Sequence, residues 1–208
     1  MVNRIDVLSE VATLAIRHIN DSGVFAAIES ALRTVAFFDI AAIFAYPPAE
    51  QPEMLHDGLK GISLPNAMQD YLAGGYLLDA VYVACMQGLA DGLYRLATLA
   101  PDAFFESDYF LSPLVHPCIS MESGSLVEEI AFCTHAPDGT ALVFSLMRST
   151  GMEAFSKEDF SALEAFAPII NAALIQHWIN RTEKKVLEKT ALNTENLNKS
   201  FRDFERDR

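Results

Sequence analysis

The sequence predicts an α+β domain in which a central antiparallel sheet of about five strands carries helices on both faces and ends in a long C-terminal helix. The strand-like runs lie next to one another, most clearly at residues 125–135 and 140–148, which Asp138-Gly139 joins as a hairpin. The helical patterns come in blocks before, between and after the strands. This order favours antiparallel pairing, because parallel strands alternate one by one with crossover helices.

The N-terminal region should provide two helices and the first two strands. Apolar residues recur at three- and four-residue steps over Ile5–Ile19 and Val24–Ala36, which predicts two helices. Asp21 or Ser22 is the expected N-cap of the second helix. The almost entirely apolar run Phe37–Tyr46 predicts a buried central strand, since a strand covered on both faces has no polar side. A shorter strand at Met54–Gly61 should pair with it.

The middle of the chain should alternate helices with one further strand. Pro65 suits a first helical turn, so we expect a helix over Leu64–Ala73 that ends at Gly74-Gly75. A second helix is expected at Leu77–Gln87, a strand at Gly92–Leu99 and a short helical piece at 101–107.

The C-terminal region should be one long helix. Ser156 is the expected N-cap, and Asp159 three residues later completes a variant of the capping box. The helix should run to at least Arg181 with a kink at Pro168. Beyond it, Val186, Leu197, Phe201 and Phe204 can line a narrow seam, which predicts a helical stalk over 181–208.

Charge is distributed unevenly along the 208 residues. Residues 1–180 contain 7 Lys and Arg against 22 Asp and Glu, whereas residues 181–208 contain 8 against 6. A body this acidic repels phosphate backbones, so we do not expect it to bind nucleic acid itself. The sequence shows neither a signal peptide nor an apolar run long enough to span a membrane, so we expect a cytoplasmic protein without membrane contact.

The three cysteines, Cys85, Cys118 and Cys133, have no disulfide framework spacing and are interpreted as reduced, buried thiols. Two short pairs, His116/Cys118 and Cys133/His135, offer a metal-site alternative, although one-residue gaps are not the usual spacing of zinc ligands. None of the sequence motifs of hydrolases, phosphate loops or metalloproteases occurs. We therefore expect no enzyme, no cofactor and no metal.

The stretch from Leu64 to Phe110 holds five of the chain's six tyrosines. A tyrosine buries a large ring yet keeps a hydroxyl that needs a partner, and an apolar pocket with a few polar groups is typical of small-molecule sites. This composition predicts a ligand-binding site; ordinary core packing with satisfied hydroxyls is the alternative. The expected ligand-binding residues are Tyr71, Tyr76, Asp79, Tyr82, Tyr94 and Phe105.

The segment GYLLDAVYVACMQGLADGLYRLATLAPDAFFESDYF resembles the N-terminal sensor half of LuxR-type transcriptional regulators. The resemblance extends through the hairpin Leu126–Arg148 and the helix FSKEDFSALEAFAPIINAALIQHW, over roughly residues 20–180. The order of elements is also similar to the GAF/PAS-like sensor fold. The resemblance implies an autoinducer-binding-like sensor domain at 1–180 and a stalk at 181–208 toward a helix-turn-helix DNA-binding domain that this sequence lacks.

Within that resemblance, Asp79 matches the acid that accepts a hydrogen bond from the ligand's amide, and Tyr71 matches the tyrosine before it. Ala80 stands where the class has proline, and the tryptophan expected ahead of Tyr71 is missing, since the only tryptophan is Trp178. The alternative is that Asp79 is an acid on the surface of a helix, or one that caps a neighbouring turn.

We therefore expect a homodimeric domain that senses a small organic ligand and contacts DNA only through the helix-turn-helix domain. The other interpretation is a ligand-free dimerisation module, and an enzyme is the least favoured. The helices at 24–35 and 161–179 have more apolar positions than one sheet face needs, which favours the dimer. Coverage of that surface by the helix Ile5–Ile19 of the same chain is the alternative.

Overall fold

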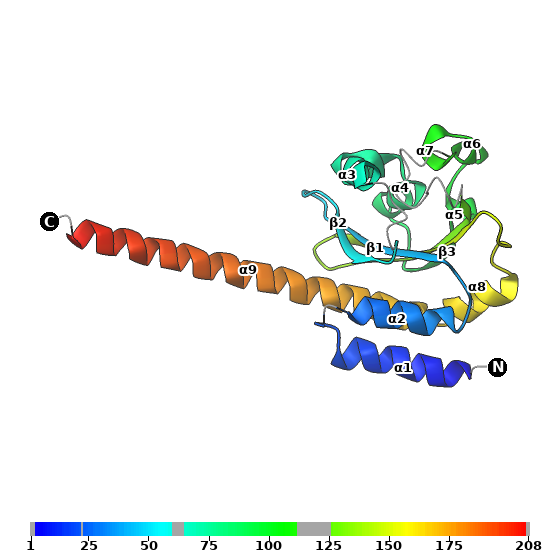
Figure 1. Cartoon of the computed structure of the whole chain (residues 1–208), viewed down its shortest axis with the longest axis horizontal. Coiled ribbons are helices and arrows are strands. Elements are labelled where there is room, and N and C mark those ends of the chain that lie inside the picture. The colour runs from blue at the N-terminus through cyan, green and yellow to red at the C-terminus, as the bar shows by residue number, and fades with distance from the viewer. Residues whose placement is uncertain (1–2, 22, 60–64, 112–125, 207–208) are drawn as a thin grey trace.

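A five-stranded antiparallel sheet divides the molecule into two layers, in a computed structural model that describes residues 3–21, 23–59, 65–111 and 126–206 (Figure 1). The spatial order of the strands is β2-β1-β5-β4-β3, and every neighbouring pair is antiparallel. The predicted α+β class with a central antiparallel sheet is confirmed. The strands are β1 (Ile40–Tyr46), β2 (Glu53–Asp57), β3 (Gly92–Arg95), β4 (Leu126–His135) and β5 (Ala141–Ser149).

Helices cover both faces of the sheet (Figure 1). One face carries α2 (Val24–Arg33), α8 (Lys157–Glu164) and the first part of α9 (Ala167–Arg206), and α1 (Arg4–Arg17) packs outside α2 and α9. The other face carries a short-helix layer. Its members are α3 (Pro65–Ala73), the 3-10 turn η1 (Gly75–Leu78), α4 (Ala80–Met86), α5 (Leu96–Leu99), α6 (Asp102–Phe105) and α7 (Asp108–Leu111).

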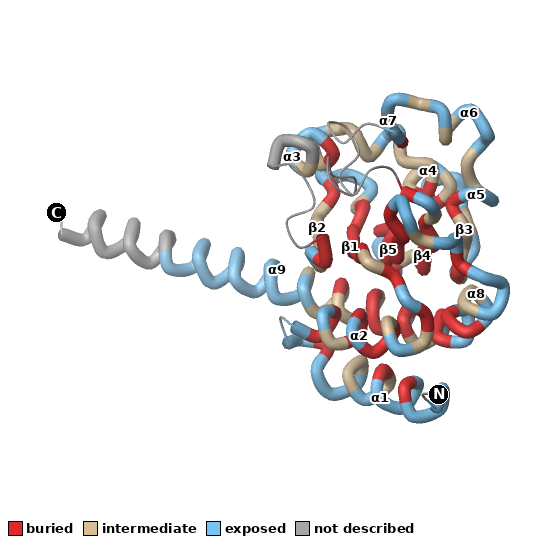
Figure 2. Tube along the Cα trace, turned by 45° about the vertical axis from the view of Figure 1, so that its right-hand side comes forward, coloured by how far each residue is buried: buried red, intermediate tan, exposed pale blue. Residues whose placement is uncertain are grey.

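The alternation of side chains along each strand gives the domain two cores. On β1, Ala41, Ile43 and Ala45 face the layer of α2 and α9, whereas Ile40, Ala42, Phe44 and Tyr46 face the short-helix layer. Every residue of β1 and β5 is buried, which Figure 2 shows as continuous red strands. The almost unbroken apolar run at 37–46 is therefore the consequence of coverage on both faces.

Two local signals in the sequence produce the expected structures. The β4–β5 hairpin closes at Gly139, whose φ of +85° is readily adopted by glycine, and the Ala136 amide donates to Thr140 O at 2.9 Å. At the start of α8, the Ser156 side chain accepts from the Asp159 amide at 2.9 Å while Asp159 accepts from the Ser156 amide at 3.1 Å. The reciprocal capping box is thus complete.

Several predicted boundaries are wrong in the first half of the chain. The N-cap position of α2 is Gly23, which has no side chain that could accept a hydrogen bond. Of the two predicted caps, Asp21 bonds to His18 instead, and Ser22 lies outside the described residues. The strand expected at Gly92–Leu99 ends at Arg95, and residues 96–99 form a helical turn closed by Ala100 N to Leu96 O at 2.9 Å. The helix expected at Leu77–Gln87 begins only at Ala80.

The long C-terminal helix is broken once, two residues before the expected kink. Leu163 O accepts from the Phe166 amide at 2.8 Å, and α9 then starts at Ala167. Pro168 therefore lies in the first turn of a new helix, where its missing N–H costs nothing. From there α9 is continuous to Arg206 and extends away from the sheet (Figure 1).

Among the helices of the described residues, none is long and apolar enough to cross a membrane.

Candidate ligand-binding site

Aromatic side chains from β1, α3, η1 and α4 form a cluster against the sheet. We call it the tyrosine cluster. Ring centroids lie 5.1 Å apart for Phe44 and Tyr71, 5.1 Å for Tyr46 and Tyr82, and 4.9 Å for Tyr76 and Tyr82. Tyr46 comes from the end of β1 and was not among the predicted residues, although it is the last residue of a predicted buried strand. The cluster is Phe44, Tyr46, Tyr71, Tyr76 and Tyr82.

A chain of hydrogen bonds runs through the cluster to Asp79. The hydroxyls of Tyr46 and Tyr71 lie 2.5 Å apart, and the Tyr71 hydroxyl donates to Asp79 Oδ2 at 2.9 Å. Tyr71 has a single hydroxyl proton, so Tyr46 is the donor in the first bond. Tyr46 and Tyr71 are both buried, and burial together with the nearby Asp79 charge raises the pKa of Tyr46 well above its usual range.

Asp79 also caps α4. Its Oδ1 accepts from the amides of Val81 at 2.8 Å and Tyr82 at 3.4 Å. This cap explains why the predicted helix at Leu77–Gln87 is interrupted, because the N-cap residue has extended backbone angles, here φ −74° and ψ 120°. Burial raises the pKa of Asp79, while the bonds from Tyr71 and the two amides act in the opposite direction. Asp79 thus faces the tyrosine cluster with one oxygen and the helix with the other.

A second carboxyl group, Glu129, lies in the same layer. It is only 7% exposed, and its Oε1 accepts from Ser145 Oγ at 2.6 Å on the neighbouring strand. Burial, followed by the charge of Asp79, raises the pKa of Glu129 to about 8. Glu129 was not among the predicted site residues, and its neighbour Glu128 faces the opposite side of β4. The signal was an acid within the apolar strand 126–135, a rare and costly position.

Both acids of that pair are largely enclosed, because helices cover the two faces of the sheet. Glu128 accepts from Arg95 Nη1 and, at 2.6 Å, from the Phe155 amide, on the side of α8. Glu128 is paired with a cation, whereas Glu129 is not paired with any basic side chain of the described residues.

Two predicted site residues lie apart from the tyrosine cluster. The Tyr94 hydroxyl donates to Ala90 O at 2.9 Å, next to the edge strand β3. Phe105 packs with Phe104 and Phe110 at centroid distances of 5.5 and 5.1 Å in a second aromatic group. Both residues pack against the same core as the cluster, but no ring contact or hydrogen bond joins them to it within the described part of the chain. Their role in ligand binding stays a prediction.

Cys85 on α4 and Cys133 on β4 are free and buried in the same layer. The hydrogen bond between the Cys133 and Cys85 thiols, and then burial, raises the pKa of Cys133 well above its usual range. Of the metal alternative, His116 and Cys118 lie outside the described residues, and His135 bonds through Nε2 to Cys85 O at 3.1 Å. Among described residues no three His, Cys, Asp or Glu side chains are grouped as metal ligands.

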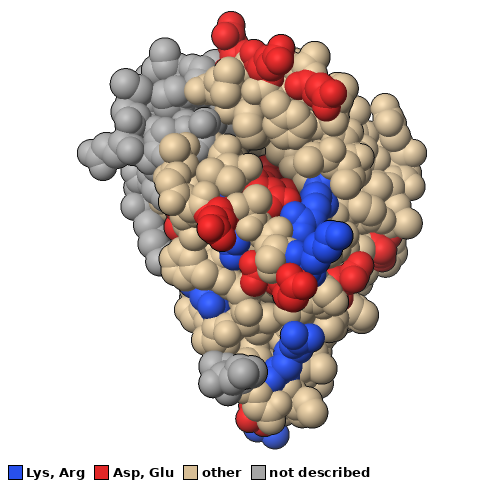
Figure 3. All heavy atoms as spheres, turned by 90° about the vertical axis from the view of Figure 1, so that its right-hand side faces the viewer, with Lys and Arg blue, Asp and Glu red and all other residues tan. Residues whose placement is uncertain are grey.

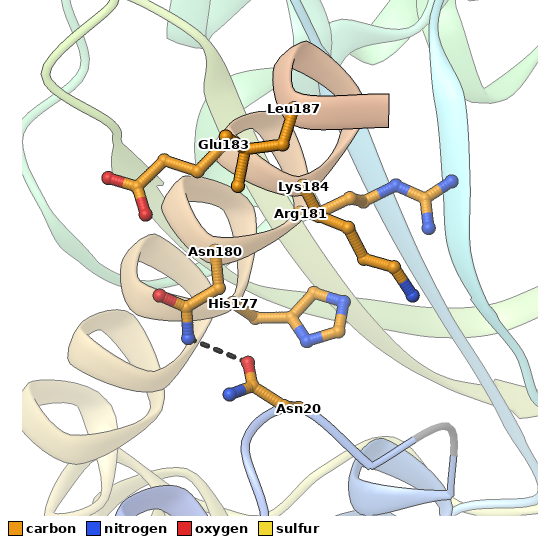
Figure 4. Close-up of a pocket in the computed structure, with 7 residues that line it drawn as sticks. All are labelled: Asn20, His177, Asn180, Arg181, Glu183, Lys184 and Leu187. Carbon is orange, nitrogen blue, oxygen red and sulfur yellow. Dashed lines mark hydrogen bonds between the residues drawn. The ribbon is translucent and has the colours of Figure 1, made fainter. Parts of the chain in front are cut away.

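The point where α9 leaves the body is tied to three separate elements. Trp178 Nε1 donates to Asp138 Oδ2 of the hairpin turn at 2.8 Å, and Arg181 binds Glu53 of β2 at 2.9 Å, with Lys185 on the same carboxylate. His177 bonds to Ile19 O at 2.8 Å. Beside it lies a groove of about 630 Å³, where Asn180 Nδ2 donates to Asn20 Oδ1 at 2.7 Å (Figure 4). The groove is lined by Asn20, His177, Asn180, Arg181, Glu183, Lys184 and Leu187.

Figure 3 shows the face of the molecule on the side of α8, and this face has no continuous basic area. Lys and Arg are interleaved with Asp and Glu near the middle of this face, and further acids gather at its upper edge. This distribution agrees with the acidic composition of the body.

Comparison with known structures places the fold among bacterial regulator domains. The structure is similar to the ligand-binding domain of VqsR from Pseudomonas aeruginosa, with a TM-score of 0.63 and 17% identity over 81% of this chain and 94% of that one. It is also similar to CepR2 from Burkholderia cenocepacia, an N-acylhomoserine-lactone-dependent LuxR-family transcription factor, with a TM-score of 0.58 and 14% identity over 86% and 98% of the two chains.

The chain therefore has the fold of LuxR-family ligand-binding domains, as the sequence resemblance implied. These neighbours are regulator domains rather than enzymes. No known protein-family model matches the sequence, and no characterised protein sequence matches it.

Proposed function

We propose that this chain is the small-molecule-sensing domain of a LuxR-type transcriptional regulator, with its ligand between the sheet and the short-helix layer. The observation that carries the proposal is the chain of polar groups, Tyr46–Tyr71–Asp79, inside an otherwise apolar layer. A few fixed polar groups in apolar surroundings can orient a small molecule. The similarity of the fold to LuxR-family ligand-binding domains supports the proposed class of protein. Phe44, Tyr76 and Tyr82 would form the aromatic walls.

In this proposal Asp79 anchors the ligand through Oδ2, the oxygen that binds Tyr71. An N–H donor of the ligand would join or replace the Tyr71 hydroxyl there, while Oδ1 keeps its bonds to the α4 amides. Ligand contact and the start of α4 are then coupled through a single carboxylate. Tyr94 and Phe105 would contact only a ligand long enough to reach β3 or α6.

The signal would leave through α9 as a shift in population between two arrangements of this helix. Glu53 connects β2 to Arg181 and Lys185 at the start of the stalk, and β2 leads through Gly58 and Leu59 toward the short-helix layer. A ligand that repacks this layer can thus change how the body holds the stalk. We propose that the stalk passes the change to a DNA-binding module.

We further propose that the domain works as a homodimer joined along the stalk. Beyond Arg181 the described side chains of α9 are nearly all exposed, including Val186, Leu187 and Leu192 (Figure 2). A long helix without tertiary contacts is marginally stable, and pairing with a second copy would support it. The layer of α2 and α9 is covered by α1 of the same chain, so the stalk, rather than this layer, is the surface that favours the dimer.

A thermal-shift screen with a metabolite panel tests the proposal. At least one small organic compound should raise the melting temperature of the wild-type protein, and the shift should shrink in Asp79→Asn. The second candidate, a ligand-free dimerisation module, is favoured by the fact that both Asp79 oxygens already have protein partners. It predicts a dimer without any shift across the panel.

A further inference from the structure

The short-helix layer contains two acids that form no ion pair with any basic side chain of the described residues. Asp79 and Glu129 both lie in it, and the charge of Asp79 reaches Glu129. Three arginines of the described body pair with other acids, Arg95 with Glu128, Arg33 with Glu29 and Arg148 with Asp159. A buried carboxylate is normally paired, because an isolated charge in a low dielectric is costly.

The hydroxyl groups that bond to one another and to these two acids already use their protons inside the protein. Tyr46 donates to Tyr71, Tyr71 donates to Asp79, and Ser145 donates to Glu129 Oε1. Glu129 Oε2 accepts no hydrogen bond from any described residue, although the residue is only 7% exposed. The position left open is therefore on a carboxyl group, and no described residue supplies it with a donor or a positive charge.

We propose that the ligand carries a basic amine that pairs, as an ammonium group, with Glu129 Oε2. This inference rests on the proposed function and narrows it to amine ligands. Without a ligand, Glu129 keeps its proton, because it is buried beside Asp79 and no described cation compensates its charge. When the ammonium group binds, the carboxyl proton leaves to solvent and an N–H of the ligand donates to the carboxylate. The half-buried Tyr76 and Tyr82 would contact the apolar part of the ligand.

Other ionisable groups facing this position come from β1, α3, α4 and β4. They are Tyr46, Tyr71, Asp79, Cys85 and Cys133. The pKa values of Tyr46 and Cys133 are raised well above their usual ranges, so these groups stay protonated near neutral pH. Both proteins compared below, the wild type and Glu129→Gln, contain Asp79, so any difference between them is due to the Glu129 carboxyl group.

The test uses four compounds with one scaffold: 3-phenylpropylamine, 3-phenylpropan-1-ol, 3-phenylpropanoic acid and N-(3-phenylpropyl)acetamide. Calorimetry at pH 7 should show the amine binding wild-type protein about tenfold or more tighter than the alcohol, the usual scale of a charged hydrogen bond. In Glu129→Gln, which keeps the shape, this preference should fall to within about threefold.

The wild-type protein provides a second readout that does not depend on the variant folding. Because Glu129 must lose its proton, the affinity for the amine should rise about tenfold from pH 6 to pH 7 and level off above pH 8, whereas that of the alcohol should stay constant. Calorimetry in phosphate and in Tris should report release of close to one proton per amine bound at pH 6.5.

Three results would overturn the inference. Tighter binding of the acetamide or alcohol than of the amine would show that Glu129 acts as a neutral donor, and the proposed sensing function would stand. Amine binding without proton release would remove Glu129 from the contact. Binding of none of the four compounds would reject the amine class, while a compound found by the metabolite screen would still support sensing.

Discussion

Replacing Glu129 by glutamine should remove one source of pH dependence from the folding stability, and the sign of this dependence follows from the structure. The pKa of this carboxyl is raised to about 8 in the folded protein, against 4.5 for the free group. The folded state therefore binds more protons than the unfolded state between these values, so the wild-type protein loses stability as the pH rises through this window. Glutamine has no proton to lose.

The size of the effect follows from the width of the window. Each pH unit in which only the folded state holds the proton is worth about 1.4 kcal/mol, so the stability of Glu129→Gln relative to wild type should rise by up to about 4 kcal/mol between pH 5 and pH 8. Urea unfolding at pH 5, 6, 7 and 8, with equal slopes required for both proteins, measures this difference.

The exposed acid Glu164 provides the matched control, and Glu164→Gln should follow the wild-type curve. Parallel stability curves for wild type and Glu129→Gln would refute the reasoning, because they would mean that Glu129 is ionised in the folded protein throughout this range.

Three further results are expected. Asp79→Asn should weaken ligand binding by about 1.5–3 kcal/mol, the scale of a charged hydrogen bond. Asparagine keeps the α4 cap but has a single oxygen, so the bond from the Tyr71 hydroxyl should be lost at about 1 kcal/mol of stability, whereas Asp79→Ala should lose the cap as well and cost more. Unaltered affinity in calorimetry would remove Asp79 from the site. Cys85 and Cys133, which are buried, should react slowly with a thiol reagent in native protein and quickly in denaturant, and equal rates would show that the layer opens freely. Sedimentation equilibrium at micromolar concentration should give twice the chain mass of 22.9 kDa; the single-chain mass would reject the dimer.

The elements that the sequence predicts best are those with a local physical cause. The capping box at Ser156 and Asp159 and the Asp138-Gly139 turn depend on residues within a few positions, so their geometry follows from the sequence itself. The apolar run ending at Tyr46 likewise predicts a buried strand, since no polar face is available to solvent.

The wrongly predicted boundaries lie where a side chain can form hydrogen bonds with more than one partner. Asp21 could cap α2 but bonds His18, and Asp79 interrupts a continuous apolar pattern by capping α4. At Arg95 the strand pattern continues in the sequence, yet pairing with β4 stops there and a helical turn follows. Such outcomes depend on tertiary contacts that periodicity does not contain.

The candidate site shows the same limit. Tyr71, Tyr76, Asp79 and Tyr82 are close together in the sequence, and their clustering is foreseeable from it. Tyr46 and Glu129 lie on strands that are distant in sequence from residues 71–82, and only the pairing of β1, β5 and β4 brings them to the same layer. The position of the Glu129 carboxyl near Asp79 thus depends on strand pairing, which the local sequence pattern does not contain.

Non-denaturing mass spectrometry of protein purified from cells tests the central claim, small-molecule sensing, most directly. The account predicts a fraction of the protein with a mass above that of the bare chain, and a smaller bound fraction in Asp79→Asn purified in the same way. The bare-chain mass alone, together with no thermal shift across the metabolite panel, would contradict the account and favour a ligand-free dimerisation module.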